Sequence, residues 1–376
     1  MDGSNQTAVS DVFNQRFDAP LKQADASIIN SIVEYYQGLS VSGRQALYDL
    51  LQHHESSLAA KAIAAVGINW PGVVQKLIAR IKGVIDADPR ASARQLMELA
   101  TVGTYGGLRA PDDVISQAKA AWQSDPAFRK LTEPVTIPQM PVLQAARPGV
   151  LVLVRHGETS WSVAVLNKWA GWHDSKVTPK GLKEAFAAGE RIKDAGLKLD
   201  KAYASDFSRA KDTLTEVLKA MGQALPMVCD RALRERDYGD MIGWNRKDVG
   251  AVFGEKVLRE WRRGYSGYAA RPPGGENLAD VQERTLPFYV GNVMSDIASG
   301  KNVIVSAHGN SLRSILVYHR GQTQGRKLDE KEIIGLEVPL SVPIVIVFDN
   351  RLHHQEFWVD PKKTSADVIT FLRQNR

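Results

Sequence analysis

The chain has 376 residues, which is too long for one ordinary domain and comfortable for two. Hydrophobic residues make up 44% and charged residues 24%, as in a soluble globular protein, and we recognise no membrane-spanning run and no secretory signal. The net charge is +6, but the sequence has no long Lys/Arg run and no basic residues interleaved with aromatic ones, so it does not indicate binding to nucleic acid. The single cysteine, Cys229, favours a reducing, cytoplasmic location.

Residues 1–131 are predicted to form an α-helical domain. Apolar side chains recur at helical spacing in residues 28–36 and 74–85. The stretch 39–51 is amphipathic, which suits core packing by default, with oligomerisation or binding of a protein partner as the alternatives. We find no catalytic motif in this domain.

A linker is predicted at residues 132–148, because its prolines favour extended chain and exclude helix. The remainder, 149–376, is predicted to form an α/β domain. Strands of the buried type alternate there with helices: strand 150–154, helix 179–195, strand 202–204, a helix from Ser208, strand 302–306 and a helix from Ser311. This alternation predicts a mostly parallel sheet flanked by helices.

Histidine and arginine side chains follow these strands. Arg155 and His156 end the first strand, His308 ends the later one, and Arg209 follows the strand between them. In open α/β sheets, ligands bind at the edge where the carboxyl ends of the strands meet. One His-Gly pair alone would be explained by a structural role. Two imidazoles and two guanidiniums together suit a dianionic phosphoryl group, with one imidazole as the nucleophile.

Several separate motifs, in this order along the chain, resemble those of the histidine phosphatase superfamily. Within that superfamily the nearest likeness is to the cofactor-dependent phosphoglycerate mutases, and it runs from about residue 149 to residue 349. The motifs are Leu153-Val154-Arg155-His156-Gly157-Glu158, Ser205 with Arg209-Ala210, Leu233-Arg234-Glu235-Arg236 and Ala307-His308-Gly309-Asn310-Ser311-Leu312-Arg313. The resemblance implies a phosphoglycerate mutase-like fold.

The resemblance also implies a role for each catalytic residue. His156 would be the nucleophile that becomes phosphohistidine, and Arg155, Arg209 and His308 would surround the phosphoryl group. Glu235 would be the general acid and base for the substrate hydroxyl, since a carboxyl group can give or take that proton. The implied cofactor is 2,3-bisphosphoglycerate, as the phosphate primer, and no metal is implied.

A mutase must also hold the substrate carboxylate and exclude water. The resemblance assigns this task to Gly171, Tyr238, Arg246, Arg262, Arg263 and Asn310. Asn310 is equally suited to cap the helix that follows it. The chain departs from the family pattern at Thr159, Ser162, Ala170 and Arg246. Residues 333–343 resemble the strand-turn-strand that follows the second histidine in the mutases.

Three functions are therefore open. The first is a phosphoglycerate mutase that interconverts 2-phosphoglycerate and 3-phosphoglycerate. The second is a phosphomonoester phosphatase that uses the same residues, and the third is a non-catalytic regulatory protein that keeps the phosphate pocket. In each case the expected partner is a small phosphorylated anion, and neither nucleic acid nor a membrane is expected.

Overall fold

The computed structural model of the chain describes residues 3–23, 70–267 and 269–359, together with scattered positions between 24 and 69. The chain divides into two compact units, which are described one after the other. The first unit contains residues 1–132, 244–262 and 272–274, and the second contains residues 133–243, 263–271 and 275–376.

The first unit is built from helices, as the sequence predicts. Its elements are α1 (Gly3–Arg16), α2 (Asp18–Lys22), α6 (Trp70–Ile81), α7 (Pro89–Thr101), the strand pair β1 (Thr104–Tyr105) and β2 (Leu108–Arg109), α8 (Asp112–Ser124), α9 (Pro126–Lys130), α12 (Arg246–Phe253) and α13 (Glu255–Arg263), whose last residue belongs to the second unit. The apolar pattern of residues 74–85 corresponds to α6 as far as Ile81, whereas Ile85 lies in the exposed turn that follows the helix. The described positions within 28–36 and 46–51 are also helical.

Residues from late in the chain belong to this helical unit. Gln95 is fully buried in α7, and its side chain accepts a hydrogen bond from the Gly274 amide at 2.8 Å and donates one to the Pro272 carbonyl at 3.0 Å. The Gly274 carbonyl accepts another from Arg80 at 2.6 Å. A Cβ atom at Gly106 would lie 2.5 Å from the ring of Pro273. These contacts explain why residues 272–274 cluster with the helices.

The second unit contains a six-stranded sheet flanked by helices, so the α/β prediction is confirmed. The strand order is β5-β4-β6-β3-β7-β8. The strands are β3 (Leu151–Arg155), β4 (Lys201–Ser205), β5 (Met227–Asp230), β6 (Val303–Ala307), β7 (Ile344–Phe348) and β8 (His354–Trp358). The pairings from β5 to β3 are parallel, whereas β7 and β8 pair antiparallel, so the sheet is mixed.

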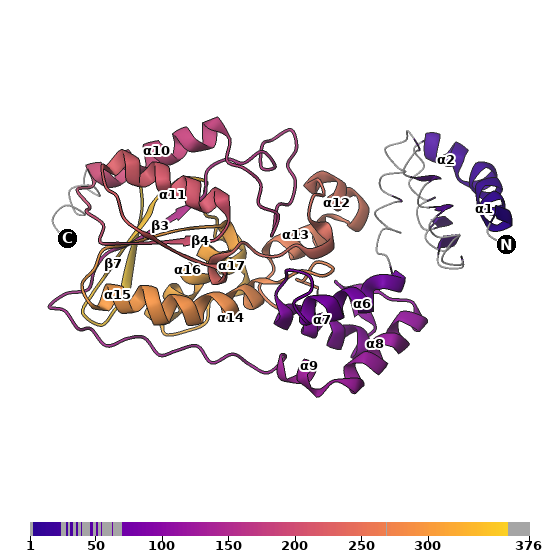
Figure 1. Cartoon of the computed structure of the whole chain (residues 1–376), viewed down its shortest axis with the longest axis horizontal. Coiled ribbons are helices and arrows are strands. Elements are labelled where there is room, and N and C mark those ends of the chain that lie inside the picture. Colours follow the sequence, from indigo (N-terminus) through magenta and orange to yellow (C-terminus); the bar gives the residue numbers. More distant parts are fainter. Residues whose placement is uncertain are drawn as a thin grey trace. The chain divides into compact units, whose positions relative to one another are not determined.

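Both faces of the sheet are covered (Figure 1). Along β3, Val152 and Val154 pack on the face with α10 (Pro179–Asp194) and α11 (Ser208–Met221). Leu151 and Leu153 pack on the opposite face. That face is covered by α14 (Leu278–Phe288), the π-helical turn η3 (Tyr289–Val293), α15 (Met294–Ala298) and α16 (Gly309–Gln324). Because successive side chains of a strand point to opposite faces, a continuous apolar run fits this two-sided burial.

The helices of this unit begin where local sequence favours it. Thr178 caps α10 by accepting a hydrogen bond from the Gly181 amide, and a proline follows at the first helical position. α16 begins at Gly309, two residues before the predicted Ser311, and its N-cap is His308. Residues 132–150 contain neither helix nor strand.

The expected strand-turn-strand at residues 333–343 is wrong. Its first residues end a short helix, α17 (Glu330–Gly335), and the next strand begins only at Ile344. The physical reason lies just upstream, where Asp329 and Glu332 form a reciprocal capping box that favours helix.

Short one-turn 3₁₀ helices, η1 (Arg231–Leu233) and η2 (Gly239–Met241), flank the segment that carries Glu235.

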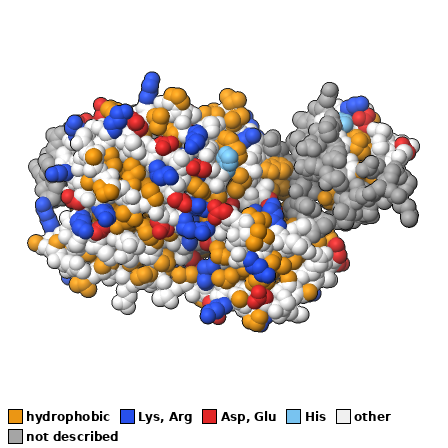
Figure 2. Space-filling model, viewed as in Figure 1, with side chains coloured by type: hydrophobic (Ala, Val, Ile, Leu, Met, Phe, Trp, Pro, Cys, Tyr) orange, Lys and Arg blue, Asp and Glu red, His pale blue; other side chains and the backbone are white. Residues whose placement is uncertain are grey.

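Lys and Arg side chains are interspersed with Asp and Glu over the visible face (Figure 2). Among the described residues, no helix is long and apolar enough to cross a membrane.

Candidate active site

Strand register brings the two histidines together. Arg155 at the end of β3 pairs with Ala307 at the end of β6, so the next residue of each strand leaves the sheet at the same edge. The His156 amide continues the ladder by donating to the Ala307 carbonyl at 3.0 Å. The rings of His156 and His308 are tilted by 58°, with their centroids 5.1 Å apart. Both rings are buried.

Gly157 allows the chain to turn at this point. A Cβ atom there would lie 2.3 Å from the Gly181 carbonyl oxygen, which no side chain tolerates. The Gly157 amide donates to Thr213 Oγ1 at 3.0 Å, which fastens the turn to α11. The turn therefore depends on a residue without a side chain.

The hydrogen bonds of His156 fix which ring nitrogen can react. Its Nδ1 lies 2.8 Å from the Gly157 carbonyl oxygen, which can only accept, so Nδ1 carries the proton. Nε2 therefore presents its lone pair. Burial, together with the charges of Arg209 and Arg155, holds the pKa of His156 well below its usual value. The ring is thus neutral at physiological pH, as a nucleophile must be.

His308 has the opposite arrangement. Arg209 Nε, which can only donate, lies 3.2 Å from His308 Nδ1, so the His308 proton is on Nε2. This Nε2 is buried and has no hydrogen-bond partner within the described part of the chain. Burial and Arg209 lower the pKa of His308 as well. A buried N–H donor without a partner is costly, and an anion at this place would satisfy it.

The two arginines are held firmly. Arg209 is 1% exposed, and besides His308 it donates to the carbonyls of Gly171 (2.8 Å) and His173 (2.7 Å). Burial lowers the pKa of Arg209 to about 10, so it keeps its charge at neutral pH. Arg155 donates to the Val338 carbonyl at 2.8 Å, while its buried Nε has no partner among the described residues. Both guanidiniums can therefore hold an anion in a fixed geometry.

Glu235 is linked to the same edge through α16. Its Oε1 accepts from the Arg236 amide (2.7 Å), the Asn310 amide (3.1 Å) and Asn310 Nδ2 (2.9 Å). Its Oε2 makes no hydrogen bond within the described residues, which leaves one carboxyl oxygen for proton transfer. The sequence allowed Asn310 to be the helix cap, but His308 is the N-cap and Asn310 binds Glu235 instead.

A family model of the histidine phosphatase superfamily (branch 1) matches residues 151–331. The 2,3-bisphosphoglycerate-dependent phosphoglycerate mutase of Bartonella quintana is 40% identical over 201 residues, covering 53% of this chain and 92% of that protein. The enzyme of that name from Chelativorans sp. is 43% identical over 198 residues, 52% of this chain and 91% of its own. The chain belongs to the histidine phosphatase superfamily. Within the superfamily, it is similar to these mutases at about 40% identity.

Among solved structures, the mycobacterial glucosyl-3-phosphoglycerate phosphatase in complex with VO3 is 22% identical, with a TM-score of 0.45. The match covers 57% of this chain and 97% of that one. The matched family region starts at residue 151, so the helical N-terminal region lies outside it.

The substrate-binding residues expected from the superfamily resemblance are divided between the two units. Gly171 and Tyr238 lie with the catalytic residues: the Gly171 carbonyl binds Arg209, and the Tyr238 hydroxyl accepts from Asn310 Nδ2 at 3.2 Å. Arg263 pairs with Glu337 in the second unit. Arg246 and Arg262 belong to the first unit and are described with it, Arg246 as the first residue of α12.

The backbone at Gly171 requires a glycine. Its φ is +49°, a conformation that favours glycine, and a Cβ atom would lie 3.1 Å from the Tyr238 amide. The next residue, Trp172, donates from its indole nitrogen to the Glu235 carbonyl at 2.7 Å. One loop thus contacts both the Arg209 guanidinium and the Glu235 backbone.

The departures from the family pattern at Thr159 and Ser162 are paired with each other. Ser162 Oγ accepts from the Thr159 amide at 2.8 Å, and the two hydroxyl oxygens are 3.2 Å apart. Thr159 is 1% exposed. These hydroxyls are therefore engaged with one another. The third departure, Ala170, offers no hydroxyl.

Sequence reasoning assigned no role to Arg313 and Arg284, which hold Asn310 and the Glu235 backbone in place. Arg313 donates to Asn310 Oδ1 at 2.8 Å and to the Ile333 carbonyl at 2.8 Å, and it is 2% exposed. Arg284 donates to the Glu235 carbonyl at 2.9 Å. Arg313 was part of the family-like motif 307–313, but it was given no role there. Within the described residues, no group of three or more His, Cys, Asp or Glu side chains is placed to hold a metal ion.

Proposed function

We propose that the chain is a phosphoglycerate mutase that interconverts 2-phosphoglycerate and 3-phosphoglycerate through a phosphohistidine at His156. The observation that carries this proposal is the complementary pair of tautomers. His156 offers a lone pair on Nε2, while His308 offers a buried N–H on Nε2 without a partner among the described residues. One ring can therefore form a bond to phosphorus while the other stabilises an equatorial oxygen.

The proposed reaction has two balanced halves. In the first, the free hydroxyl of the bound monophosphoglycerate attacks the phosphoryl group on charged His156: the new O–P bond forms as the bond from phosphorus to His156 Nε2 breaks, and Glu235 Oε2 takes the hydroxyl proton. In the second, His156 Nε2 bonds to the phosphorus at the other position as the bond from that phosphorus to the glycerate oxygen breaks, and Glu235 returns the proton to this oxygen, so that His156 is charged again. The three donors on Oε1 hold the carboxyl group in place through both halves.

The site residues fit 2,3-bisphosphoglycerate as the cofactor. The buried donors of Arg155 and His308 that lack partners among the described residues suit a phosphoryl group. Arg155, Arg209 and His308 would hold it there. When bound, this cofactor would supply the phosphoryl group that charges His156. Gly171, Tyr238, Asn310 and Arg263 are proposed to bind the substrate. For Arg246 and Arg262, which belong to the first unit, this role stays a prediction from the family resemblance.

The names of the curated relatives support mutase activity over hydrolysis, because those proteins are matched over about nine tenths of their length. The alternative is phosphomonoester hydrolysis at the same residues. It is favoured by the hydroxyls of Thr159 and Ser162, which bind each other and so leave fewer contacts for a second anionic group. A mutase must hold that group, whereas a phosphatase must admit water.

The two activities are separated by incubating the full chain with 3-phosphoglycerate, with and without the bisphosphate. Appearance of 2-phosphoglycerate that depends on the bisphosphate supports the mutase, and free phosphate without the isomer supports the phosphatase. Glu235→Gln should reduce turnover about 10²–10⁴-fold, the usual contribution of a general acid or base. Glu330→Gln, at an exposed residue of α17, is the matched control. Neither product, and no phosphate trapped on His156, would favour a non-catalytic protein.

A further inference from the structure

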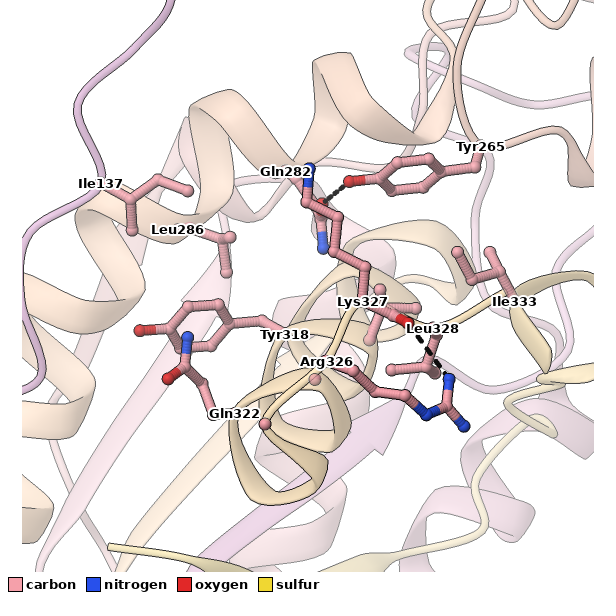
Figure 3. Close-up of a pocket in the computed structure, with 13 residues that line it drawn as sticks. Ile137, Tyr265, Gln282, Leu286, Tyr318, Gln322, Arg326, Lys327, Leu328 and Ile333 are labelled. Carbon is pink, nitrogen blue, oxygen red and sulfur yellow. Dashed lines mark hydrogen bonds between the residues drawn. The ribbon is translucent and has the colours of Figure 1, made fainter. Parts of the chain in front are cut away.

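A cavity lies in the catalytic unit, and neither of the two histidines lines it. Its volume is about 490 Å³, within the range of small-molecule sites. Residues of α14, of the last turns of α16 and of the segment 325–333 line it, and Ile137 of the linker lies at its edge. Figure 3 shows these side chains around the common space.

The walls of this cavity are apolar and aromatic. Leu286, Val317, Leu328 and Ile333 line it, together with the rings of Tyr265 and Tyr318. Gln282 provides a polar point that is already fixed: its side chain accepts from the Tyr265 hydroxyl at 2.8 Å and donates to the Ser314 carbonyl at 3.0 Å. The site thus combines a large apolar surface with a few fixed polar groups, as ligand pockets do.

The charge of the lining is of one sign. Arg326 and Lys327 contribute to it, and no carboxylate is among the lining residues. Arg326 is neutralised by Glu332, to which it donates two hydrogen bonds of 2.7 and 2.8 Å. The exposed Lys327 ammonium makes no ion pair with any described residue. One cation therefore remains for a ligand.

We propose that this cavity binds a small amphiphilic carboxylate, with its apolar body between Tyr318 and Leu328 and its charge on Lys327. The Tyr318 hydroxyl, which has no hydrogen-bond partner among the described residues, offers a donor beside the apolar wall. Cation, donor and apolar walls lie around one space, which is the complement of such a ligand.

The cavity wall is also connected to Glu235. The Ile333 carbonyl accepts from Arg313, which donates to Asn310, and Asn310 holds Glu235 Oε1. A ligand that fixes the backbone at Ile333 therefore acts on the position of the acid/base carboxyl group. By thermodynamic linkage, an anion bound at the histidines changes the affinity of the cavity by the same factor.

The binding test uses two fluorescent probes on the full chain: the aromatic anion 8-anilinonaphthalene-1-sulfonate and its uncharged analogue N-phenyl-1-naphthylamine. Gln322→Trp fills the cavity and should lower the affinity for both probes at least tenfold. Gln324→Trp places the same ring on the same helix outside the cavity and should leave both unchanged. Equal affinity in the two variants, or no saturable binding to the wild-type chain, overturns the proposal.

Lys327→Gln separates charge from apolar burial. It should weaken the anionic probe about two- to fivefold, as for an exposed ion pair, and leave the uncharged probe unchanged. An equal loss of affinity for both probes contradicts the role of Lys327.

Saturating orthovanadate should change the affinity for the anionic probe at least twofold, and an unchanged affinity contradicts the connection to Glu235. The binding arms do not depend on the proposed function, so their failure is distinguishable from a failure of mutase activity.

Discussion

Acid should destabilise the catalytic unit at a pH where its carboxylates are still ionised. Three buried histidines are neutral in the folded chain: burial, with the charge of Arg209, lowers the pKa of His156 and of His308, and burial lowers that of His319 to about 3. In the unfolded chain each has a pKa of about 6.5. Unfolding at pH 6 therefore takes up protons.

The sign and the size follow from linkage. Because the unfolded state binds more protons, the free energy of unfolding rises with pH; these contributions are complete above pH 6.5 and are lost as the pH falls toward the folded-state pKa. Between pH 6.5 and 5.5 each histidine should lose about 1 kcal/mol, and the three together about 3 kcal/mol. A drop of this size is a large part of the stability of an ordinary domain.

The assay is urea unfolding at pH 7.5, 6.5, 6.0 and 5.5, followed by tryptophan fluorescence. His319→Gln removes one buried histidine outside the candidate site, where its Nε2 lies 2.6 Å from the Tyr289 hydroxyl, and should remove about a third of the drop. His353→Gln removes an exposed imidazole and is the matched control. A drop below about 1 kcal/mol, or an unchanged drop in His319→Gln, would refute the neutrality of these histidines.

Two further substitutions test the geometry of the edge. Arg209→Lys keeps the charge, but a lysine ammonium cannot reach His308 Nδ1 and two carbonyls at once. Turnover should therefore fall about 10²–10³-fold, and the ¹⁵N spectrum of His308 should no longer show a single tautomer. An unchanged spectrum would contradict the hydrogen bond from Arg209 Nε to His308 Nδ1. Gly157→Ala places a methyl group 2.3 Å from the Gly181 carbonyl oxygen and should lower the free energy of unfolding in urea by about 1–3 kcal/mol. Gly291→Ala should not, because its methyl group would meet no atom within 4 Å apart from its chain neighbours and its own helix backbone. Equal effects of the two substitutions would rule out the clash.

The sequence was sufficient for features that depend on short stretches of chain. The apolar runs at β3 and β6 predict strands buried on both faces, and the residue after each is then placed at one edge by parallel register alone. The helix predicted at residues 179–195 corresponds to α10, which begins at Pro179 behind its Thr178 cap. These features could be predicted because period, burial and capping are local properties.

Features that depend on long-range contact could not be predicted. Gln95 gives no sign in the sequence that it binds Pro272 and Gly274, nor does the sequence show that residues 244–262 cluster with the N-terminal helices. The tautomers of the two histidines likewise depend on partners that only the folded chain brings together. At α17, local capping favoured helix where a family likeness indicated strand.

The most direct measurement is the position of phosphate on the charged protein. The full chain is incubated with 2,3-bisphosphoglycerate, quenched in base, and examined by ³¹P NMR and by peptide mass spectrometry. Because the Gly157 carbonyl occupies Nδ1, phosphate should appear on Nε2 of His156. Phosphate on Nδ1, on His308, or on neither histidine would contradict the assignment of His156 Nε2 as the nucleophile.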